Sequence, residues 1–206
     1  MSSDIRIRKG LDIQLEGKAE AITKVAPLSQ VYGLRPAEFH RVIPKLIARE
    51  GATVKAGEPV FYDKRDERVL FPSPVSGTIT EIIRGERRKI LEIRITPDAQ
   101  QSFHEYEKKQ VDSLSPEQIK EHLLQTGCWP LIKQRPYDVI ASVDSQPKAI
   151  FISACKTNPL APDYDYVLKG KEKELQVALT ALSKLTTGKV HVSVFKDSSL
   201  SPFRNL

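Results

Sequence analysis

Regularly spaced glycines and prolines constrain the fold of residues 50–95 more than any other feature of the chain. They interrupt short β-rich runs, and each supplies a positive φ or a fixed φ that suits a turn. In the last run, Leu91, Ile93 and Ile95 alternate with charged residues, so one face of this strand is buried and the other is solvated. We therefore expect a compact all-β unit here. The breaks fall at Gly51, Gly57, Pro72, Pro74, Gly77 and Gly85.

Two sequence phrases within this unit carry a resemblance. A G-x-x-V-x-x-G-x-x-V phrase runs from Gly51 to Val60, and an S-P-x-x-G-x-I phrase runs from Ser73 to Ile79. Together they resemble the barrel-sandwich hybrid fold of biotinyl and lipoyl carrier domains. Such carriers also present a lysine, in a Met-Lys-Met or an Asp-Lys-Ala sequence, at the tip of an exposed hairpin. Here the tip is expected near Arg65–Glu67, and Lys64 lies close by without either sequence. We expect the carrier scaffold without its swinging arm, and keep a carrier as an alternative function.

The composition is that of a water-soluble globular protein. The 206 residues are 40% hydrophobic and 28% charged, enough for two modest domains with real cores. No apolar run approaches the roughly 20 residues of a membrane-spanning helix, and the N-terminus lacks the apolar core of a signal peptide. A cytoplasmic location is therefore expected, with no transmembrane segment.

The net charge of +6 favours an acidic partner only weakly, because the basic residues are scattered. The densest group is interspersed with carboxylates and is expected to be a solvated hairpin face, with an acidic partner or a lipid surface as the alternative. Nucleic-acid binding is not expected, since the sequence lacks clusters of basic residues interleaved with aromatic residues. The group consists of Arg84, Arg87, Arg88 and Lys89, interspersed with Glu81 and Glu86.

The second half of the chain predicts α/β structure. Ser115 is a suitable helix N-cap before Pro116, and Gly127 can end that helix in a left-handed turn. A buried strand over 148–154 and another over 190–194 flank an amphipathic helix. Gly188 is expected to cap this helix, whose apolar positions are Leu175, Ala178, Leu179, Leu182 and Leu185.

These elements give a multi-domain α+β plan. Residues 1–98 are predicted to hold N-terminal strands near 5–13 and the barrel-sandwich hybrid, 99–114 a linker, and 115–206 a Rossmann-like α/β domain. Two parallel strands are too few to close a sheet, which usually has about four to six. We therefore expect the α/β domain to be truncated, with a further C-terminal region in the native protein.

No residue pattern nominates a catalytic centre. Gly-rich phosphate loops and the G-x-S-x-G nucleophile elbow are missing, and the four histidines are far apart. Two cysteines without a C-x-x-C spacing are expected to be reduced and mostly buried. We predict no catalytic residue, no metal site and no covalently bound cofactor.

Two proline–aromatic segments suggest a binding site instead. Each places flat apolar side chains beside a guanidinium group on irregular backbone, which suits a quinone ring whose carbonyl oxygen needs a donor. Plain loop packing or a subunit contact is the alternative interpretation. The candidate quinone-binding residues are Tyr32, Leu34, Arg35, Pro36, Trp129, Arg135 and Tyr137.

Phrases spread in order over nearly the whole chain resemble the N-terminal half of the A subunit of the sodium-translocating NADH:quinone reductase. They are found in 9–17, 34–36, 51–57, 73–77, 84–85, 149–152, 157–161 and 186–190.

This resemblance implies a peripheral subunit on the cytoplasmic side of the bacterial inner membrane. The complex passes electrons from NADH to ubiquinone and transports Na⁺. The resemblance also implies that the flavin and iron–sulfur centres belong to other subunits and that the B subunit in the membrane is the main partner. It further implies that the chain helps to bind quinone. A scaffold that only docks a membrane partner remains the other alternative.

Overall fold

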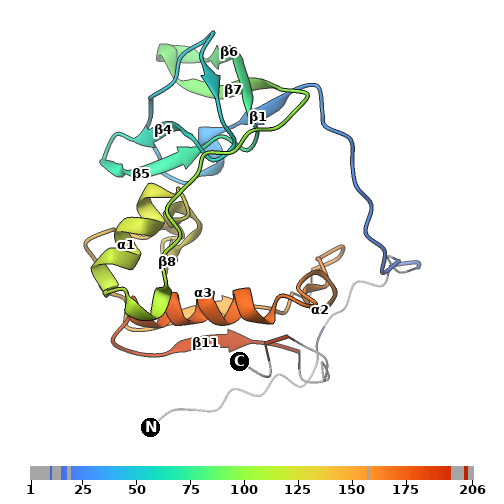
Figure 1. The fold of residues 1–206 in the computed structure, drawn as a ribbon, viewed down its shortest axis with the longest axis vertical. Coiled ribbons are helices and arrows are strands. Elements are labelled where there is room, and N and C mark those ends of the chain that lie inside the picture. The colour runs from blue at the N-terminus through green and yellow to red at the C-terminus, as the bar shows by residue number, and fades with distance from the viewer. Residues whose placement is uncertain (1–9, 11–14, 18–19, 157, 196–201, 204–206) are drawn as a thin grey trace.

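The computed structural model of the chain describes residues 10, 15–17, 20–156, 158–195 and 202–203. The strands expected near 5–13 lie outside the described residues, apart from Gly10. The described elements form a β-rich lobe at one end and a layer of α3 over β11 at the other, with α1 between them (Figure 1). A segment leading into β1 returns toward α2, where Thr23 Oγ1 lies 3.3 Å from Tyr166 Oη.

The β-rich lobe consists of two facing antiparallel sheets. One has the strand order β1-β7-β6-β3 and the other has the order β2-β4-β5. The strands are β1 (Tyr32–Leu34), β2 (Pro44–Leu46), β3 (Thr53–Val54), β4 (Pro59–Asp63), β5 (Asp66–Pro72), β6 (Gly77–Arg84) and β7 (Ile90–Pro97). Short 3-10 turns lie at η1 (Pro36–Glu38) and η2 (Glu86–Arg88). The all-β unit expected over 50–95 is therefore confirmed.

The core of this lobe lies between the two sheets. Phe61 and Phe71 stack with centroids 4.4 Å apart, and the ring of Phe39 meets Phe71 edge-on at 4.6 Å. Ile93 and Ile95 face this core as the alternating sequence predicts. The prediction is wrong for Leu91, because a register shift between Ile83 and Arg84 leaves it exposed and Ile90 is buried instead. The core residues of these two strands are Ile79, Ile90, Ile93 and Ile95.

The Ser73–Gly77 phrase forms a buried corner between β5 and β6. The Ser73 hydroxyl donates to a backbone carbonyl at 2.6 Å, and Ser76 Oγ accepts the N–H of Ser102 at 2.9 Å. Both serines are therefore buried with their hydrogen bonds satisfied. At Gly77 the backbone of β6 approaches the carbonyl of Thr96 so closely that no Cβ fits.

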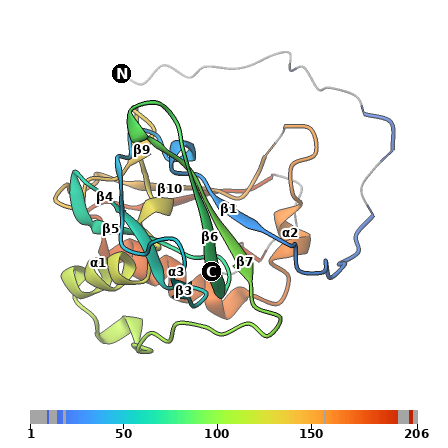
Figure 2. The same ribbon diagram turned by 90° about the horizontal axis from the view of Figure 1, so that it is seen from above.

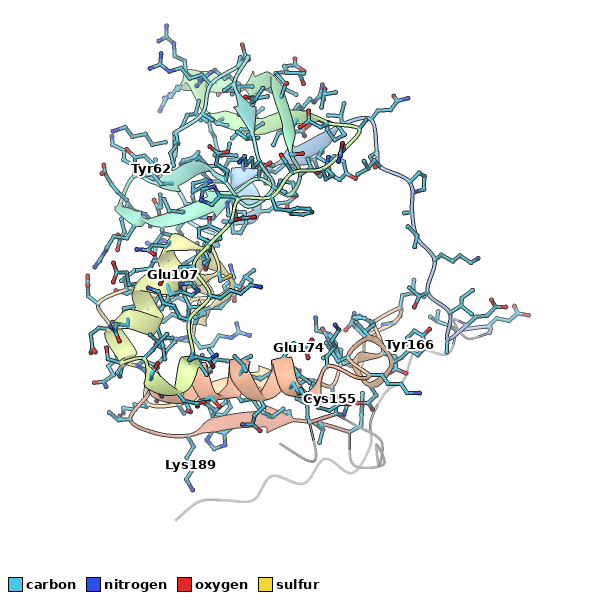
Figure 3. The ribbon with its side chains drawn as sticks, viewed as in Figure 1. Tyr62, Glu107, Cys155, Tyr166, Glu174 and Lys189 are labelled. Atoms are coloured by element: carbon cyan, nitrogen blue, oxygen red, sulfur yellow. The ribbon has the colours of Figure 1, made fainter. Side chains whose placement is uncertain are left out.

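The connection after β7 is held on the β-rich lobe. The N–H of Ala56 donates to Ser102 O at 3.0 Å, and the Tyr106 hydroxyl donates to Gly57 O at 2.7 Å. Figure 3 shows Glu107 on the same connection, midway between Tyr62 in the β-rich lobe and Glu174 on α3.

The second half of the chain contains three helices, four short strands and two 3-10 turns among the described residues. The strands pair as an antiparallel hairpin, β8-β9, and as a parallel pair, β10-β11. The elements are η3 (Val111–Ser113), α1 (Pro116–Gln125), η4 (Trp129–Leu131), β8 (Lys133–Gln134), β9 (Val139–Ile140), β10 (Ile150–Ser153), α2 (Tyr164–Val167), α3 (Glu172–Lys184) and β11 (Val190–Ser193).

Helix α1 begins as expected from its sequence. Ser115 is the N-cap, and its hydroxyl accepts the N–H of Gln118 while the Gln118 side chain accepts the N–H of Ser115, which makes a capping box. Pro116 follows in the first turn, and Gly127 lies just past the helix with φ +69°. The predicted start and end of this helix are confirmed.

Three expectations for this half are wrong. The strand predicted to be buried over 148–154 is β10, whose residues are alternately half-buried and exposed, with Phe151 75% exposed, as in a sheet with one solvated face. Helix α3 ends at Lys184 with Leu185 as its C-cap, so Gly188 does not cap it and lies instead in close contact with the backbone of Lys148. Cys128 is exposed rather than buried, because it lies in the turn between α1 and η4, while Cys155 is half-buried.

The two halves share one hydrophobic core. Leu124 of α1, Trp129 of η4 and Val143 are buried in the same cluster as Phe61 and Phe71. Figures 1 and 2 both show α1 lying beside β5, and residues of the two elements are in contact. The β-rich lobe therefore packs directly on the first elements of the second half.

Candidate functional site

Strand β1 and the turn after it position the first predicted segment. Tyr32 and Leu34 are half-buried and pack against the core of the β-rich lobe, whereas Gly33 and Arg35 face outward, as strand alternation requires. Pro36 begins η1 and is buried. Arg35 is therefore the side chain of this segment that solvent and a ligand can reach, with 61% of it exposed.

A line of ion pairs holds Arg35 in place across three strands. Arg35 Nε donates to Glu92 Oε2 at 2.8 Å, and Arg94 Nε donates to Glu92 Oε1 at 2.8 Å. Arg94 Nη1 donates in turn to Glu81 Oε2 at 2.8 Å. The hydrogen bond from Arg94, and then the one from Arg35, lowers the pKa of the Glu92 carboxyl. Glu92 thus stays ionised between two guanidinium groups at neutral pH.

A cavity of about 490 Å³ opens beside these ion pairs. Arg35 uses its Nε–H on Glu92, so its Nη groups are the donors left for a ligand in the cavity. A carbonyl oxygen on a flat ring is one acceptor that such a fork-shaped donor fits. The cavity is lined by Val31, Gly33, Arg35, Glu38, Glu92 and Arg94.

The second predicted segment divides into a buried part and an exposed part. Trp129 is 4% exposed, and its indole N–H donates to Ala141 O at 2.8 Å, so its polar atom is already occupied. Arg135 and Tyr137 lie in the turn of the β8–β9 hairpin with their side chains in solvent. Arg135 Nη1 is 3.6 Å from Asp138 Oδ1.

Phe39 links the two predicted segments. It follows η1 on the chain, and Lys133 Nζ at the start of the β8–β9 hairpin lies 5.9 Å from the centroid of its ring. Arg35 lines the cavity, whereas Trp129, Arg135 and Tyr137 are not among its lining residues.

Sequence reasoning missed Glu92 and Arg94 as members of the site. The alternating pattern of β7 correctly placed them on the solvated face, but it gave no sign that β1 pairs beside them. The register that aligns Gly33 with Arg94 is what brings Arg35 to Glu92. A non-local strand pairing of this kind leaves no local signal in the sequence.

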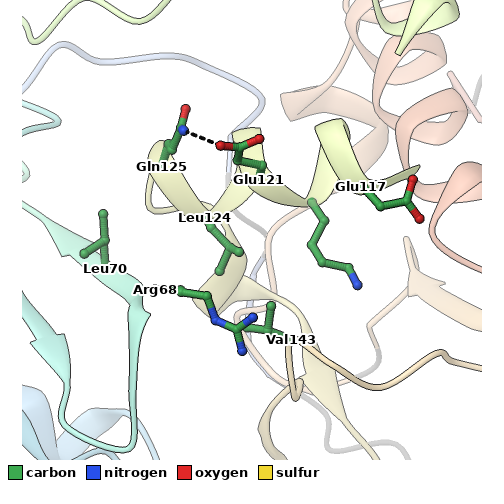
Figure 4. Close-up of a pocket in the computed structure, with 8 residues that line it drawn as sticks. Arg68, Leu70, Glu117, Glu121, Leu124, Gln125 and Val143 are labelled. Carbon is green, nitrogen blue, oxygen red and sulfur yellow. Dashed lines mark hydrogen bonds between the residues drawn. The ribbon is translucent and has the colours of Figure 1, made fainter. Parts of the chain in front are cut away.

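A second cavity, of about 400 Å³, lies where α1 meets β5 (Figure 4). At its edge, the guanidinium of Arg68 binds Asp66 at 2.7 Å and Asp144 at 2.9 Å. Because both carboxylates bind this guanidinium, its strong donors are largely taken, and an anionic ligand is not favoured here. The cavity is lined by Arg68, Leu70, Glu117, Lys120, Glu121, Leu124, Gln125 and Val143.

The comparisons with known proteins cover nearly the whole chain. The family described as "NqrA N-terminal barrel-sandwich hybrid domain" matches residues 5–98, and the family described as "NqrA second alpha/beta domain" matches residues 114–205. The chain belongs to the NqrA family. The fold class predicted from the sequence, a barrel-sandwich hybrid followed by an α/β domain, is therefore confirmed.

Curated relatives agree with this family. The chain is 37% identical over 204 residues to the A subunit of the Na(+)-translocating NADH-quinone reductase of Actinobacillus pleuropneumoniae serotype 3. It is 37% identical over 207 residues to the protein of the same name from Haemophilus influenzae strain PittGG. These alignments cover 94% and 95% of the chain and 44% of each relative. The chain thus spans under half the length of the curated NqrA relatives that it matches.

The β4–β5 hairpin contains the tip that the sequence predicts near residues 65–67. The turn between β4 and β5 consists of Lys64 and Arg65, so Lys64 lies in the turn itself, earlier than the expected tip at 65–67. Asp63 binds the Arg65 guanidinium at 2.9 Å and accepts the N–H of Ile43. The turn is therefore anchored on its Asp63 and Arg65 side, while Lys64 is exposed.

Among the residues that the structure describes, no group of three or more His, Cys, Asp and Glu side chains is placed to hold a metal ion. None of the described helices combines the length and the apolar character that crossing a bilayer requires.

Proposed function

We propose that this chain is part of the A subunit of a Na⁺-translocating NADH:quinone reductase and acts in catalysis only within that complex. The observation that carries the proposal is the 37% identity to proteins of that name over 94% of the chain. The complex reduces ubiquinone with electrons from NADH and transports Na⁺. In this role the chain is a peripheral subunit on the cytoplasmic side of the bacterial inner membrane. It contacts the B subunit in the membrane, and the flavin and iron–sulfur centres are held elsewhere in the complex.

Within that complex, we propose that the chain contributes to quinone binding at the cavity beside Arg35. The Nη groups of Arg35 donate to a quinone carbonyl oxygen, and Glu92 fixes the guanidinium from its Nε side. Tyr32, Leu34 and Pro36 support β1 from the core.

The β8–β9 hairpin supplies the other side of the proposed quinone site. Arg135 and Tyr137 are exposed on its turn and can contact the ring or the mouth of the site. Trp129 anchors the hairpin by its hydrogen bond to Ala141. The link through Lys133 and Phe39 supports a common site for both segments.

Substitution of Arg35 in the assembled complex tests the quinone site. We expect Arg35→Met to raise the KM for a short-tailed quinone by about tenfold, because one charge-assisted hydrogen bond contributes roughly 1.5–3 kcal/mol. Reduction of the complex by NADH should not change, since that step precedes quinone. Arg49→Met is the matched control, because Arg49 is also an exposed arginine of the β-rich lobe.

The same variants separate quinone binding from docking. An unchanged KM in Arg35→Met would remove Arg35 from the quinone site. If Arg35→Glu prevents assembly while the KM of any complex that assembles stays normal, the cavity beside Arg35 is a docking surface and the chain is a scaffold.

A carrier function is favoured by one observation, the exposed position of Lys64 in the β4–β5 turn. A carrier would bear a biotinyl or lipoyl group on this lysine. Intact mass spectrometry of the chain from a host that biotinylates and lipoylates its own carriers decides the matter. An adduct that disappears in Lys64→Arg would establish the carrier, and an unmodified mass would reject it.

A further inference from the structure

The loop that joins β6 to β7 concentrates positive charge at one end of the molecule. Residues 84–89 hold four cations and one carboxylate, a net charge of +3 in a chain of net charge +6. The β6–β7 sheet lies at the end of the molecule opposite α3 and β11 (Figure 1). The cations are Arg84, Arg87, Arg88 and Lys89, and all are exposed.

These cations lack the ion pairs that other arginines of the lobe make. Within the described part of the chain, none of the four lies within ion-pair distance of a carboxylate. Farther along the same hairpin, Arg94 binds both Glu81 and Glu92, so these carboxylates are already engaged. Glu86 is the acidic residue in the loop itself. The positive field of the tip therefore remains largely uncompensated.

The backbone of the loop is fixed in an unusual conformation. Arg87 and Arg88 are consecutive left-handed residues, with φ 52° and 59°. The loop is closed by the N–H of Gly85, which donates to Lys89 O at 2.8 Å, and by Arg84 Nη1, which donates to Arg88 O at 3.3 Å. Left-handed backbone at non-glycine residues is unfavourable and is found preferentially at functional sites. The cations are thus presented on an ordered loop.

A β-bulge places an apolar side chain beside the cations. Ile83 pairs with Glu92 and Arg84 pairs with Ile90, so Leu91 has no partner residue across the hairpin. Leu91 is 41% exposed and lies beside Gly85 at the base of the loop. A single apolar side chain next to several long cationic ones matches the boundary between lipid headgroups and acyl chains.

We propose that the tip of the β6–β7 hairpin binds the anionic headgroup surface of a phospholipid membrane, with Leu91 at the acyl boundary. A protein partner fits less well, because the six residues of the loop include no aromatic one, whereas each side of a stable protein interface comprises roughly 20–30 residues. Lipid phosphates need no complementary shape and attract each basic residue separately. This interaction does not depend on the proposed reductase function, since it requires no other subunit.

Vesicle flotation of the purified chain tests the lipid surface. The probes are vesicles of phosphatidylglycerol and phosphatidylcholine in equal parts, and vesicles of phosphatidylcholine alone, at low ionic strength. The test variant is Arg87→Asn with Arg88→Asn, because asparagine tolerates the left-handed backbone at both positions. The control, Lys169→Gln with Lys173→Gln, removes the same charge from exposed positions at the other end of the molecule.

The chain should bind the mixed vesicles and not the neutral ones, and raised salt should weaken the binding of the unsubstituted chain. The Asn double variant should lose about 25-fold in affinity, at about fivefold for each cation, while the control stays within about twofold of the unsubstituted chain. Absence of binding to mixed vesicles would overturn the proposal, as would equal losses in both variants. If the chain does not bind vesicles but binds immobilised polyglutamate, and if the Asn double variant loses that binding, the loop binds an acidic protein and not a membrane.

Discussion

At the residue scale, a single lysine ties α3 to the segment that precedes α1. Lys184 Nζ donates to the carbonyls of Val111 and Asp112 at 2.8 Å and to that of Leu114 at 3.0 Å. Since an ammonium group has three protons, these bonds use its full donor capacity. The end of α3 is thereby fixed to η3, which lies on the path from the β-rich lobe to the second half of the chain.

Lys184→Met should therefore lower the free energy of unfolding by about 2–3 kcal/mol. The methionine keeps most of the apolar stem but leaves the three carbonyls, two of them partly buried, without their charged donor. The shift of the urea midpoint measures the change. Lys173→Met, in the exposed first turn of the same helix, serves as control and should change stability by less than about 0.5 kcal/mol. Equal shifts for the two variants would show that the carbonyl contacts contribute nothing.

Gly77→Ala tests the closest backbone approach in the β-rich lobe. A Cβ at this position collides with the carbonyl of Thr96 and comes 2.8 Å from Pro97 Cα, so β6 and β7 must separate. We expect a loss of about 2–4 kcal/mol in the free energy of unfolding, measured by urea denaturation. Gly10→Ala is the control, since nothing lies within 4 Å of its Cβ position. An unchanged midpoint for Gly77→Ala would mean that the two strands separate without cost.

At the element scale, Arg68 joins β5 to the segment after β9. It binds Asp66 on its own strand and Asp144 across the junction. Its hydrogen bonds lower the pKa of both carboxyls from the ordinary value of 3.8. A carboxyl with a lowered folded-state pKa contributes stability above its unfolded pKa and loses it as the pH falls through the folded value.

The stability difference between the unsubstituted chain and Arg68→Met should therefore depend on pH in one direction. It should be constant above about pH 5 and shrink as the pH falls below 3.8, where protonation of Asp66 and Asp144 removes the ion pairs in the unsubstituted chain as well. Urea midpoints measured across this pH range give the difference. The corresponding difference for Arg49→Met should not vary with pH. A difference for Arg68→Met that persists at acid pH would indicate that packing, not charge, holds the junction.

Local sequence signals predicted individual elements better than their assembly. The N-cap at Ser115 and the left-handed Gly127 follow from short-range rules, and the structure confirms them. The alternation predicted for β7 holds at Ile93 and Ile95 but fails at Leu91, because a β-bulge changes the register there. Gly188 misled the prediction of the end of α3, because its role is a close backbone contact with Lys148 rather than a helix cap. A contact between residues this far apart has no local signature.

The candidate site shows the same division. The exposure of Arg35 follows from its position after a short strand. Its ion pair with Glu92, however, depends on the pairing of β1 with β7. The burial of Trp129 likewise depends on the packing of η4 against the β-rich lobe. Strand order and packing between distant segments decide these contacts, and neither is encoded in the residues next to them.

At the scale of the whole molecule, the β-rich lobe and the second half of the chain are not independent bodies. Trp129 and Leu124 complete the core that Phe61 and Phe71 begin. If this shared core opens, both halves lose buried apolar surface together. We therefore expect the chain to unfold in urea as one cooperative unit.

Trp129 reports on this cooperativity directly, because it is the only tryptophan of the chain and lies buried at the junction. Its fluorescence should change in the same urea transition as the far-UV circular dichroism of the helices, which is the test for two-state unfolding. Trp129→Phe should retain most of the packing and lose the hydrogen bond to Ala141, which should lower the free energy of unfolding by about 1 kcal/mol. Trp129→Ala should lower it by about 3–5 kcal/mol and shift the midpoint of the whole transition to lower urea. A fluorescence change well before the loss of helical signal would show instead that the junction opens while both halves stay folded.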